Sequence, residues 1–121
     1  MSRPVLVLVG PPASGKTTVG TAVAAALGLP FRDTDADVEA VAGSTVADLF
    51  INSGEPHFRA LEEQAVARAL GEHDGVLALG GGAVTSLATR QALVAYGWAG
   101  SAVIGRGPVL TMVCAETADE R

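Results

Sequence analysis

The fold is decided by residues 5–18, which read V-L-V-L-V-G-P-P-A-S-G-K-T-T. The run Val5–Val9 is apolar and rich in β-branched residues, which is typical of a strand buried on both faces of a parallel sheet. Gly10–Thr17 then match the phosphate-loop pattern G-x-x-x-x-G-K-[ST]. Alanine and valine recur at helical spacing over residues 16–27, and Gly28 follows as a stop signal. The stretch therefore predicts the strand, loop and helix that begin a nucleotide-binding α/β domain.

Composition indicates one globular domain over residues 1–121. The chain is 49% apolar and 17% charged, with 15 glycines, and a chain of this length buries roughly two thirds of its unfolded surface. The net charge of −5 argues against a nucleic-acid surface, which needs clustered cations. Val5–Val9 is too short for a signal peptide core or a membrane span, and the sole cysteine, Cys114, permits no internal disulfide. We expect a cytoplasmic monomer that binds neither nucleic acid nor membrane.

Short strands and helices alternate after the first helix. A second strand is expected over Phe31–Thr34, followed by a helix from about Asp35 to Ala42. Either Ser44 or Thr45 can cap the next helix, which runs through Asn52.

A longer helix, which starts at residues 54–56, is predicted to place a carboxylate on its apolar face. Its stripe consists of Phe58, Leu61, Ala65 and Ala69, and Glu62 falls on that stripe four residues after Phe58. A carboxylate that faces inward needs a partner.

A third strand, Gly75–Leu79, leads into three consecutive glycines. Ser86 is expected to cap the next helix, which extends to Gly97 and has Leu87, Leu93, Val94 and Tyr96 as its apolar residues. Short strands are possible at 102–104 and 109–113. The order of elements predicts a three-layer fold of the P-loop NTPase type, with a short parallel sheet flanked by helices.

The phosphate loop carries the clearest chemistry. Its glycines let backbone N–H groups point at an anion, and the helix that begins at Lys16 adds the positive end of its dipole. Lys16, the only lysine in the chain, can reach the β- and γ-phosphates of a nucleotide, and Thr17 can hold magnesium through its hydroxyl. The alternative is a glycine-rich turn that arises by chance.

Two acids follow the second strand, at the edge of the sheet where ligands bind in such folds. Of Asp33 and Asp35, one could orient water on magnesium while the other accepts a proton from a substrate hydroxyl. The alternative is that Asp35 only caps the helix that follows.

Other polar positions leave alternatives open. Arg59 lies three and four residues before Glu62 and Glu63, so an ordinary ion pair on the helix surface is its default interpretation. The run Gly80–Gly82 indicates either close approach of a ligand or positive φ angles, unless it is a plain flexible loop. His57 and His73 lack a partner at ligand spacing and are expected to be solvated.

Four segments taken together resemble the shikimate kinase family. They are G-P-P-A-S-G-K-T at 10–17, D-T-D at 33–35, F-R-A-L-E-E at 58–63 and L-A-L-G-G-G-A-V at 77–84. The resemblance covers about residues 5–97. It implies transfer of the ATP γ-phosphate to the 3-hydroxyl of shikimate, with Mg²⁺ as the metal. A different small-metabolite kinase of the P-loop class and a non-catalytic, nucleotide-binding remnant are the alternatives.

The resemblance also implies roles for individual residues. The catalytic residues would be Lys16 and Asp35, and the metal would be held by Thr17 and Asp33. Asp35 would also bind the substrate hydroxyls, Arg59 would bind the shikimate carboxylate, and Glu62 would orient Arg59. The remaining positions would bind nucleotide or line the substrate pocket: Gly10, Ser14, Gly15, Lys16, Thr17 and Thr18 for ATP, and Gly80, Gly81, Gly82, Phe50 and Phe58 for shikimate.

The resemblance ends after Gly97. Family members continue with an arginine-bearing lid, a second carboxylate-binding arginine, an adenine-contacting loop and a final helix, none of which we can place in residues 98–121. We therefore expect a fold that is incomplete at its C-terminal side, as a truncated or frame-shifted gene product would give.

Overall fold

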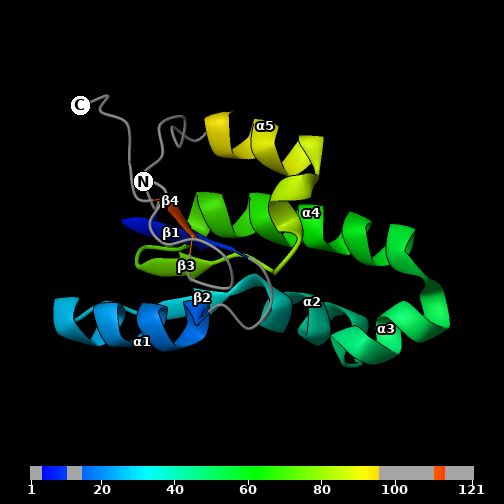
Figure 1. Cartoon of the computed structure of the whole chain (residues 1–121), viewed down its shortest axis with the longest axis horizontal. Coiled ribbons are helices and arrows are strands. Elements are labelled where there is room, and N and C mark those ends of the chain that lie inside the picture. Colours follow the sequence, from blue (N-terminus) through cyan, green and yellow to red (C-terminus); the bar gives the residue numbers. More distant parts are fainter. Residues whose placement is uncertain (1–3, 11–14, 96–110, 114–121) are drawn as a thin grey trace.

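The computed structural model describes residues 4–10, 15–95 and 111–113, which form a sheet with helices on both faces (Figure 1). The strands, in chain order, are β1 (Leu6–Val9), β2 (Phe31–Asp33), β3 (Val76–Ala78) and β4 (Thr111–Val113). The helices are α1 (Lys16–Leu27), α2 (Thr34–Ala42), α3 (Val46–Ser53), α4 (Glu55–Glu72) and α5 (Leu87–Ala95), and a single 3₁₀ turn, η1 (Ala83–Thr85), precedes α5.

The sheet has the strand order β2-β3-β1-β4. The first three strands are parallel, with Leu6 and Phe31 both opposite Val76, as the βαβ pattern predicts. β4 instead runs antiparallel to β1, with Val7 opposite Val113. This strand falls within the short strand expected at 109–113, and its direction adds an antiparallel edge to the parallel sheet. Residues 102–104 lie outside the described part of the chain.

Alternate residues of β1 and β3 face two different layers. Val7 and Leu77 point to the side of α4 and α5, where they pack with Val66 and Leu70, while Leu8 and Val76 point to α1. Both layers are visible in Figure 1, with α1 on one side of the sheet and α4 with α5 on the other. The central strands are thus covered on both faces, which explains their continuous apolar sequence.

A third apolar cluster lies beyond the strand ends. Val38 of α2, Leu49 of α3 and Phe58 of α4 are buried against one another. Thr45 caps α3 by accepting a hydrogen bond from the N–H of Asp48 at 3.1 Å. This cluster fixes the first turns of α4 against α2 and so determines where the polar residues of both helices meet.

The apolar face of α4 differs from the predicted stripe. Val66 and Leu70 are fully buried, whereas Leu61 and Ala65 are only half-buried. The reason is that the sheet contacts a face rotated toward Glu62, Val66, Ala69 and Leu70. The inward position of Glu62 is confirmed, with a residual exposure of 1%.

The apolar residues expected for α5 are also partly wrong. Leu87 and Val94 are exposed, and the buried face is made by Thr89 and Leu93, four residues apart. Ser86 does cap this helix, because its Oγ accepts from the N–H of Thr89 at 3.2 Å. Tyr96 and Gly97 lie outside the described residues.

His73 is buried rather than solvated. Its Nε2 atom donates to the carbonyl oxygen of Val76 at 3.0 Å, because the C-terminal end of α4 turns directly into β3. His57 is exposed, as expected. No helix in the described ranges is long and apolar enough to cross a membrane.

Candidate functional site

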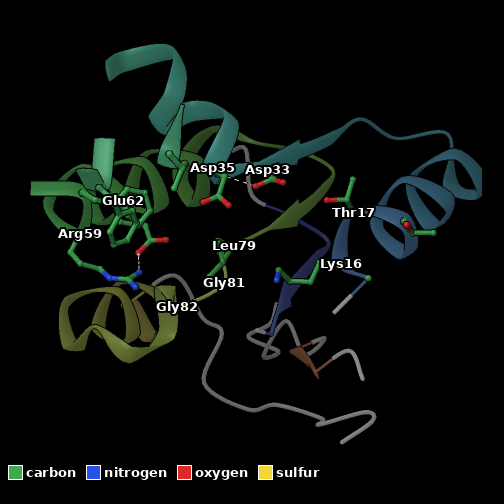
Figure 2. Close-up of a pocket in the computed structure, with 14 residues that line it drawn as sticks. Lys16, Thr17, Asp33, Asp35, Arg59, Glu62, Leu79, Gly81 and Gly82 are labelled. Carbon is green, nitrogen blue, oxygen red and sulfur yellow. Dashed lines mark hydrogen bonds and ion pairs between the residues drawn. The ribbon is translucent and has the colours of Figure 1, made fainter. Parts of the chain in front are cut away.

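A cavity of about 590 Å³ opens where the parallel strands end. Side chains from the phosphate loop, from the end of β2 and from α4 converge on it, as Figure 2 shows. This is the edge at which ligands bind in open α/β sheets. Its lining consists of Gly15, Lys16, Thr17, Thr18, Asp33, Asp35, Val46, Phe50, Phe58, Arg59, Glu62, Leu79, Gly81 and Gly82.

One end of the cavity is formed by the start of α1. Gly15 has a φ of 97°, a left-handed conformation that a glycine adopts without strain, and the helix begins at the next residue. The Nζ atom of Lys16 donates to the carbonyl oxygen of Gly10 at 2.8 Å, so the lysine side chain turns back to the residue that follows β1. Thr17 and Thr18 are exposed and line the cavity. Ser14 lies outside the described residues.

The pKa of Lys16 is lowered by burial, and the negative charges of Asp33 and Asp35 oppose this shift. The two acids therefore help to keep the ammonium group charged inside the cavity. A charged lysine beside the first turn of a helix is an arrangement that attracts phosphate.

Asp33, not Asp35, is the cap of α2. Its Oδ1 atom accepts from the N–H of Asp35 at 2.9 Å, which the dashed line in Figure 2 marks. The strand β2 thus ends at Asp33, and Thr34 is already the first helical residue. The interpretation of Asp35 as the cap is wrong, since the extended conformation required of a capping residue belongs to Asp33.

Asp35 projects into the cavity between its two ends (Figure 2). Burial raises the pKa of its carboxyl group, and the neighbouring charge of Asp33 raises it further, while Lys16 acts in the opposite direction. A carboxylate whose pKa is raised toward neutrality is a better proton acceptor than an exposed one.

The other end of the cavity contains an ion pair in which the carboxylate is buried and the arginine is partly exposed. The Nη1 atom of Arg59 donates to Oε1 of Glu62 at 2.6 Å, and its Nε atom donates to Oε2 of Glu55 at 3.4 Å. The Glu62 side chain is 1% exposed and that of Arg59 is 25% exposed. The pair is therefore not an ordinary surface pair, and Glu63 is not part of it, since it accepts from Ser86 instead.

The second carboxylate oxygen of Glu62, Oε2, is buried and has no hydrogen-bond partner among the described residues. Burial raises the pKa of Glu62, the hydrogen bond from Arg59 lowers it, and the charge of Asp35 raises it. An acceptor left unsatisfied in a cavity lining is one that a ligand donor or a water molecule can satisfy.

The glycine run approaches these side chains closely, and none of its members has a positive φ. A Cβ atom at Gly80 would collide with carboxylate oxygens of Glu62 and Asp35. A Cβ atom at Gly82 would lie 2.6 Å from the Nη2 atom of Arg59. Positive φ angles are therefore not the reason for the run, and side chains of the site itself approach Gly80 and Gly82 closely, while close approach of a ligand stays a prediction.

Gly80 does not face the cavity with its backbone donor. Its N–H donates to Oγ1 of Thr34 at 3.0 Å, in a fully buried hydrogen bond. Gly81 and Gly82 line the cavity, whereas Gly80 is not part of the lining. The expectation that all three glycines present backbone groups to a substrate is thus not met at Gly80.

Two phenylalanines form an apolar wall near the ion pair. The rings of Phe50 and Phe58 have centroids 4.6 Å apart, and the guanidinium carbon of Arg59 lies 5.2 Å from the centroid of Phe58. Val46 and Leu79 complete the apolar lining and were missed by the sequence reasoning. Leu79 follows a buried strand and Val46 begins a helix, so nothing in their spacing separates them from core residues.

The cavity therefore combines a cationic end beside a helix N-terminus, an acidic middle and an arginine held on buried carboxylate at the far end (Figure 2). In the described residues, no cluster of three or more histidine, cysteine or acidic side chains could hold a metal by itself. Together with the strand–loop–helix unit, these features define a P-loop NTPase-type domain with a second compartment beside its phosphate site.

Comparison with known proteins identifies the family. The family model for shikimate kinase matches residues 12–102. A shikimate kinase of Salinispora arenicola is 63% identical over 93 residues, covering 77% of this chain and 56% of the relative. That of Saccharopolyspora erythraea is 61% identical over 90 residues, covering 74% and 51%. The chain belongs to the shikimate kinase family.

Solved structures agree with this assignment. The shikimate kinase of Acinetobacter baumannii in complex with shikimate superimposes with a TM-score of 0.71 at 38% identity, covering 77% of this chain and 51% of that one. The enzyme of Aquifex aeolicus gives 0.69 at 29% identity, covering 78% and 55%. The chain thus spans about half the length of the relatives that it matches.

Proposed function

We propose that the protein transfers the γ-phosphoryl group of ATP to the 3-hydroxyl of shikimate. The observation that carries this proposal is that one cavity holds both Lys16 with the start of α1 and, at its other end, Arg59 paired with Glu62. The first end suits a polyphosphate and the second suits a carboxylate. A small hydroxylated acid placed between them would have its hydroxyls beside Asp35.

The nucleotide would bind at the Lys16 end. The first backbone N–H groups of α1 and the ammonium group of Lys16 would contact the phosphates, with Thr18 at the rim of the same lining. The hydrogen bond from Lys16 to the carbonyl oxygen of Gly10 keeps the ammonium group near the residue that follows β1.

Thr17 and Asp33 fit a magnesium ion that accompanies the nucleotide. Both supply oxygen donors to the same cavity, and Mg²⁺ in such sites uses only one or two protein ligands together with phosphates and water. Bound there, the ion would neutralise charge on the transferring phosphoryl group. The Asp33 oxygen that caps α2 is held in place by the N–H of Asp35, which fixes the orientation of the carboxylate.

Shikimate would bind at the Arg59 end through its carboxylate. Nε and Nη1 of Arg59 are held by Glu55 and Glu62, and Nη2 lies beside Gly82 on the cavity lining. Nη2 is the nitrogen that would donate to the substrate carboxylate in a charge-assisted contact, while the two glutamates hold Nε and Nη1 in place. Phe50 and Phe58 would cover the carbon ring of the substrate.

Asp35 would accept the proton in the transfer step. The substrate oxygen forms a bond to the γ-phosphorus, the bond between that phosphorus and the β,γ-bridging oxygen breaks, and the hydroxyl proton passes to the Asp35 carboxylate. The products are shikimate 3-phosphate and ADP. The raised pKa of Asp35 supports this role, because it brings the basicity of the carboxylate closer to that required near neutral pH.

The proposal is tested by supplying the purified chain with ATP, Mg²⁺ and either shikimate, gluconate or CMP, and by following ADP release. Turnover with shikimate alone is the expected result. Turnover with gluconate or CMP instead would contradict the choice of substrate. For the case without turnover, calorimetric titration with shikimate decides: binding that depends on Arg59 supports the acceptor site, and its absence contradicts it.

A further inference from the structure

One buried hydroxyl joins the acidic segment of the site to its glycine run. Thr34 has an exposure of 0%, and its Oγ1 atom accepts the N–H of Gly80 at 3.0 Å, although the two residues are 46 positions apart in the chain. The parallel pairing of β2 with β3 ends at Asp33 and Ala78. The Thr34–Gly80 hydrogen bond thus links the segments that follow β2 and β3, just beyond the last paired residues of these strands.

The residues around this bond belong to the site. Thr34 stands between Asp33 and Asp35, and Gly80 is packed so closely against Asp35 and Glu62 that an added Cβ atom would displace a carboxylate oxygen of each. A small shift of Gly80 would therefore displace the carboxylates of Asp35 and Glu62. Gly81 and Gly82, which line the cavity, follow directly in the chain.

We propose that Thr34 is a positioning residue, whose hydroxyl holds the glycine run at the distance from α2 that the acceptor compartment requires. The proposal rests on the proposed function for its kinetic consequence. The groups at the phosphate end are held by other contacts, because Lys16 and Thr17 are placed by β1 and α1, and the Asp33 carboxylate accepts from the N–H of Asp35. Loss of the hydroxyl should therefore affect the acceptor substrate and spare the nucleotide.

The natural test pair is Thr34→Val and Thr34→Ser. Valine keeps the shape of threonine and removes the acceptor, so the buried N–H of Gly80 loses its partner, whereas serine keeps the hydroxyl. We expect Thr34→Val to lower kcat/KM for shikimate by about tenfold or more, with KM for ATP unchanged within about twofold. Thr34→Ser should restore most of the loss.

Thr89→Val is the matched control. Thr89 is also buried, but its Oγ1 atom has no partner among the described residues, and it lies on α5 away from the cavity lining. The same removal of a buried hydroxyl is expected to leave both KM values unchanged. An equal effect of Thr89→Val and Thr34→Val on shikimate kinetics would overturn the proposal.

A second readout needs no substrate. Hydrogen exchange of the Gly80 amide should be faster in Thr34→Val than in wild type and Thr34→Ser, while the amides of Leu8 and Leu77 in the central strands keep their protection. If the wild type neither binds nor phosphorylates shikimate, the proposed function fails, and this exchange alone decides the inference. Unchanged protection of Gly80, or equal loss of both ligands in valine and serine variants, would show that Thr34 does not position the glycine run.

Discussion

The two ends of the cavity are built in different ways. At the phosphate end, Gly15, Lys16 and Thr17 are consecutive residues on one strand–loop–helix unit. At the acceptor end, Arg59 and Gly82 come from segments that meet only because α4 packs against the sheet. A contiguous motif thus fixes the first end locally, whereas the second exists only in the folded protein.

The cations of the two ends also differ in their partners. Lys16 donates to a main-chain carbonyl and remains partly exposed, while Arg59 neutralises a glutamate that is 1% exposed. Replacing the lysine should therefore weaken ligand binding more than it destabilises the fold. Replacing the arginine should weaken ligand binding and also destabilise the fold, because a buried carboxylate loses its partner.

The largest effect is expected for Lys16→Ala. Turnover should fall by about 10²–10³, the usual loss when one group that stabilises transferring charge is removed. ATP at about 100 times its Kd, which should stabilise the wild type by about 2.7 kcal/mol, should no longer raise the melting temperature. The fold should lose only about 1 kcal/mol, for the hydrogen bond to Gly10.

Arg68→Ala is the control for this substitution, since it removes an exposed cation from α4 outside the cavity lining. We expect it to leave ATP stabilisation intact. An ATP-induced shift in melting temperature that is the same in Lys16→Ala as in wild type would contradict the assignment of the phosphate end.

A smaller effect on turnover, with a larger one on stability, is expected for Arg59→Ala. Shikimate affinity should fall by about tenfold or more, and the unfolding free energy by about 3 kcal/mol, the low end for a broken buried pair because the Arg59 side chain is 25% exposed. Urea unfolding and calorimetric titration measure the two quantities separately.

The double substitution of Arg59→Met with Glu62→Leu separates the effect on stability from the effect on shikimate binding. Replacing both charges by apolar side chains should recover most of the stability, since no buried carboxylate is left unpaired, but it should not recover shikimate binding. Recovery of binding in this variant would show that the ion pair only supports the fold.

Gly82→Ala should give a weaker effect than removal of Arg59 itself. The added Cβ atom would displace the Arg59 guanidinium, which is the end of a flexible side chain, so affinity for shikimate should fall severalfold with a stability loss below about 1 kcal/mol. At Gly20 the added atom would instead collide with the Phe31 ring in the core, which should cost about 1–3 kcal/mol. The reverse order of stability losses would contradict the packing described here.

The smallest effect concerns pH. Because burial raises the pKa of Glu62 above its ordinary value of 4.5, the folded protein holds this proton more tightly than the unfolded chain does. The contribution of Glu62 to stability therefore decreases as pH rises through 4.5 and the higher native pKa. In Glu62→Gln the unfolding free energy should therefore decrease less as pH rises through this range. Urea titrations between pH 4 and 8 measure the decrease, and an equal decrease in wild type and variant would show that the pKa of Glu62 is not raised.

The phosphate end could be predicted from sequence because its residues are adjacent and their spacing carries the chemistry. The inward position of Glu62 could also be predicted, since helical periodicity places it beside Phe58. Periodicity could not select Val66 and Leu70 over Leu61 and Ala65, since both sets repeat at helical spacing and only packing against the sheet decides between them.

Residue spacing could not place distant segments side by side, and only the family resemblance put Arg59 and the glycine run in one pocket. The hydrogen bond from Gly80 to Thr34 crosses 46 residues. The burial of His73 is a local effect, because its hydrogen bond to Val76 forms in the short turn between α4 and β3, whose geometry residue spacing does not specify. A glycine run indicates close approach, but it does not say whether a ligand or a neighbouring side chain approaches.

A single cavity with two separable ends is the central feature of the site. The most direct test is to measure, by calorimetry, the dissociation constants of shikimate and of a non-hydrolysable ATP analogue for wild type, Lys16→Ala and Arg59→Ala. We predict a crossed pattern, in which Lys16→Ala loses the nucleotide and keeps shikimate, while Arg59→Ala loses shikimate and keeps the nucleotide. Parallel loss of both ligands in either variant that still unfolds cooperatively would show that the two ends are not separable.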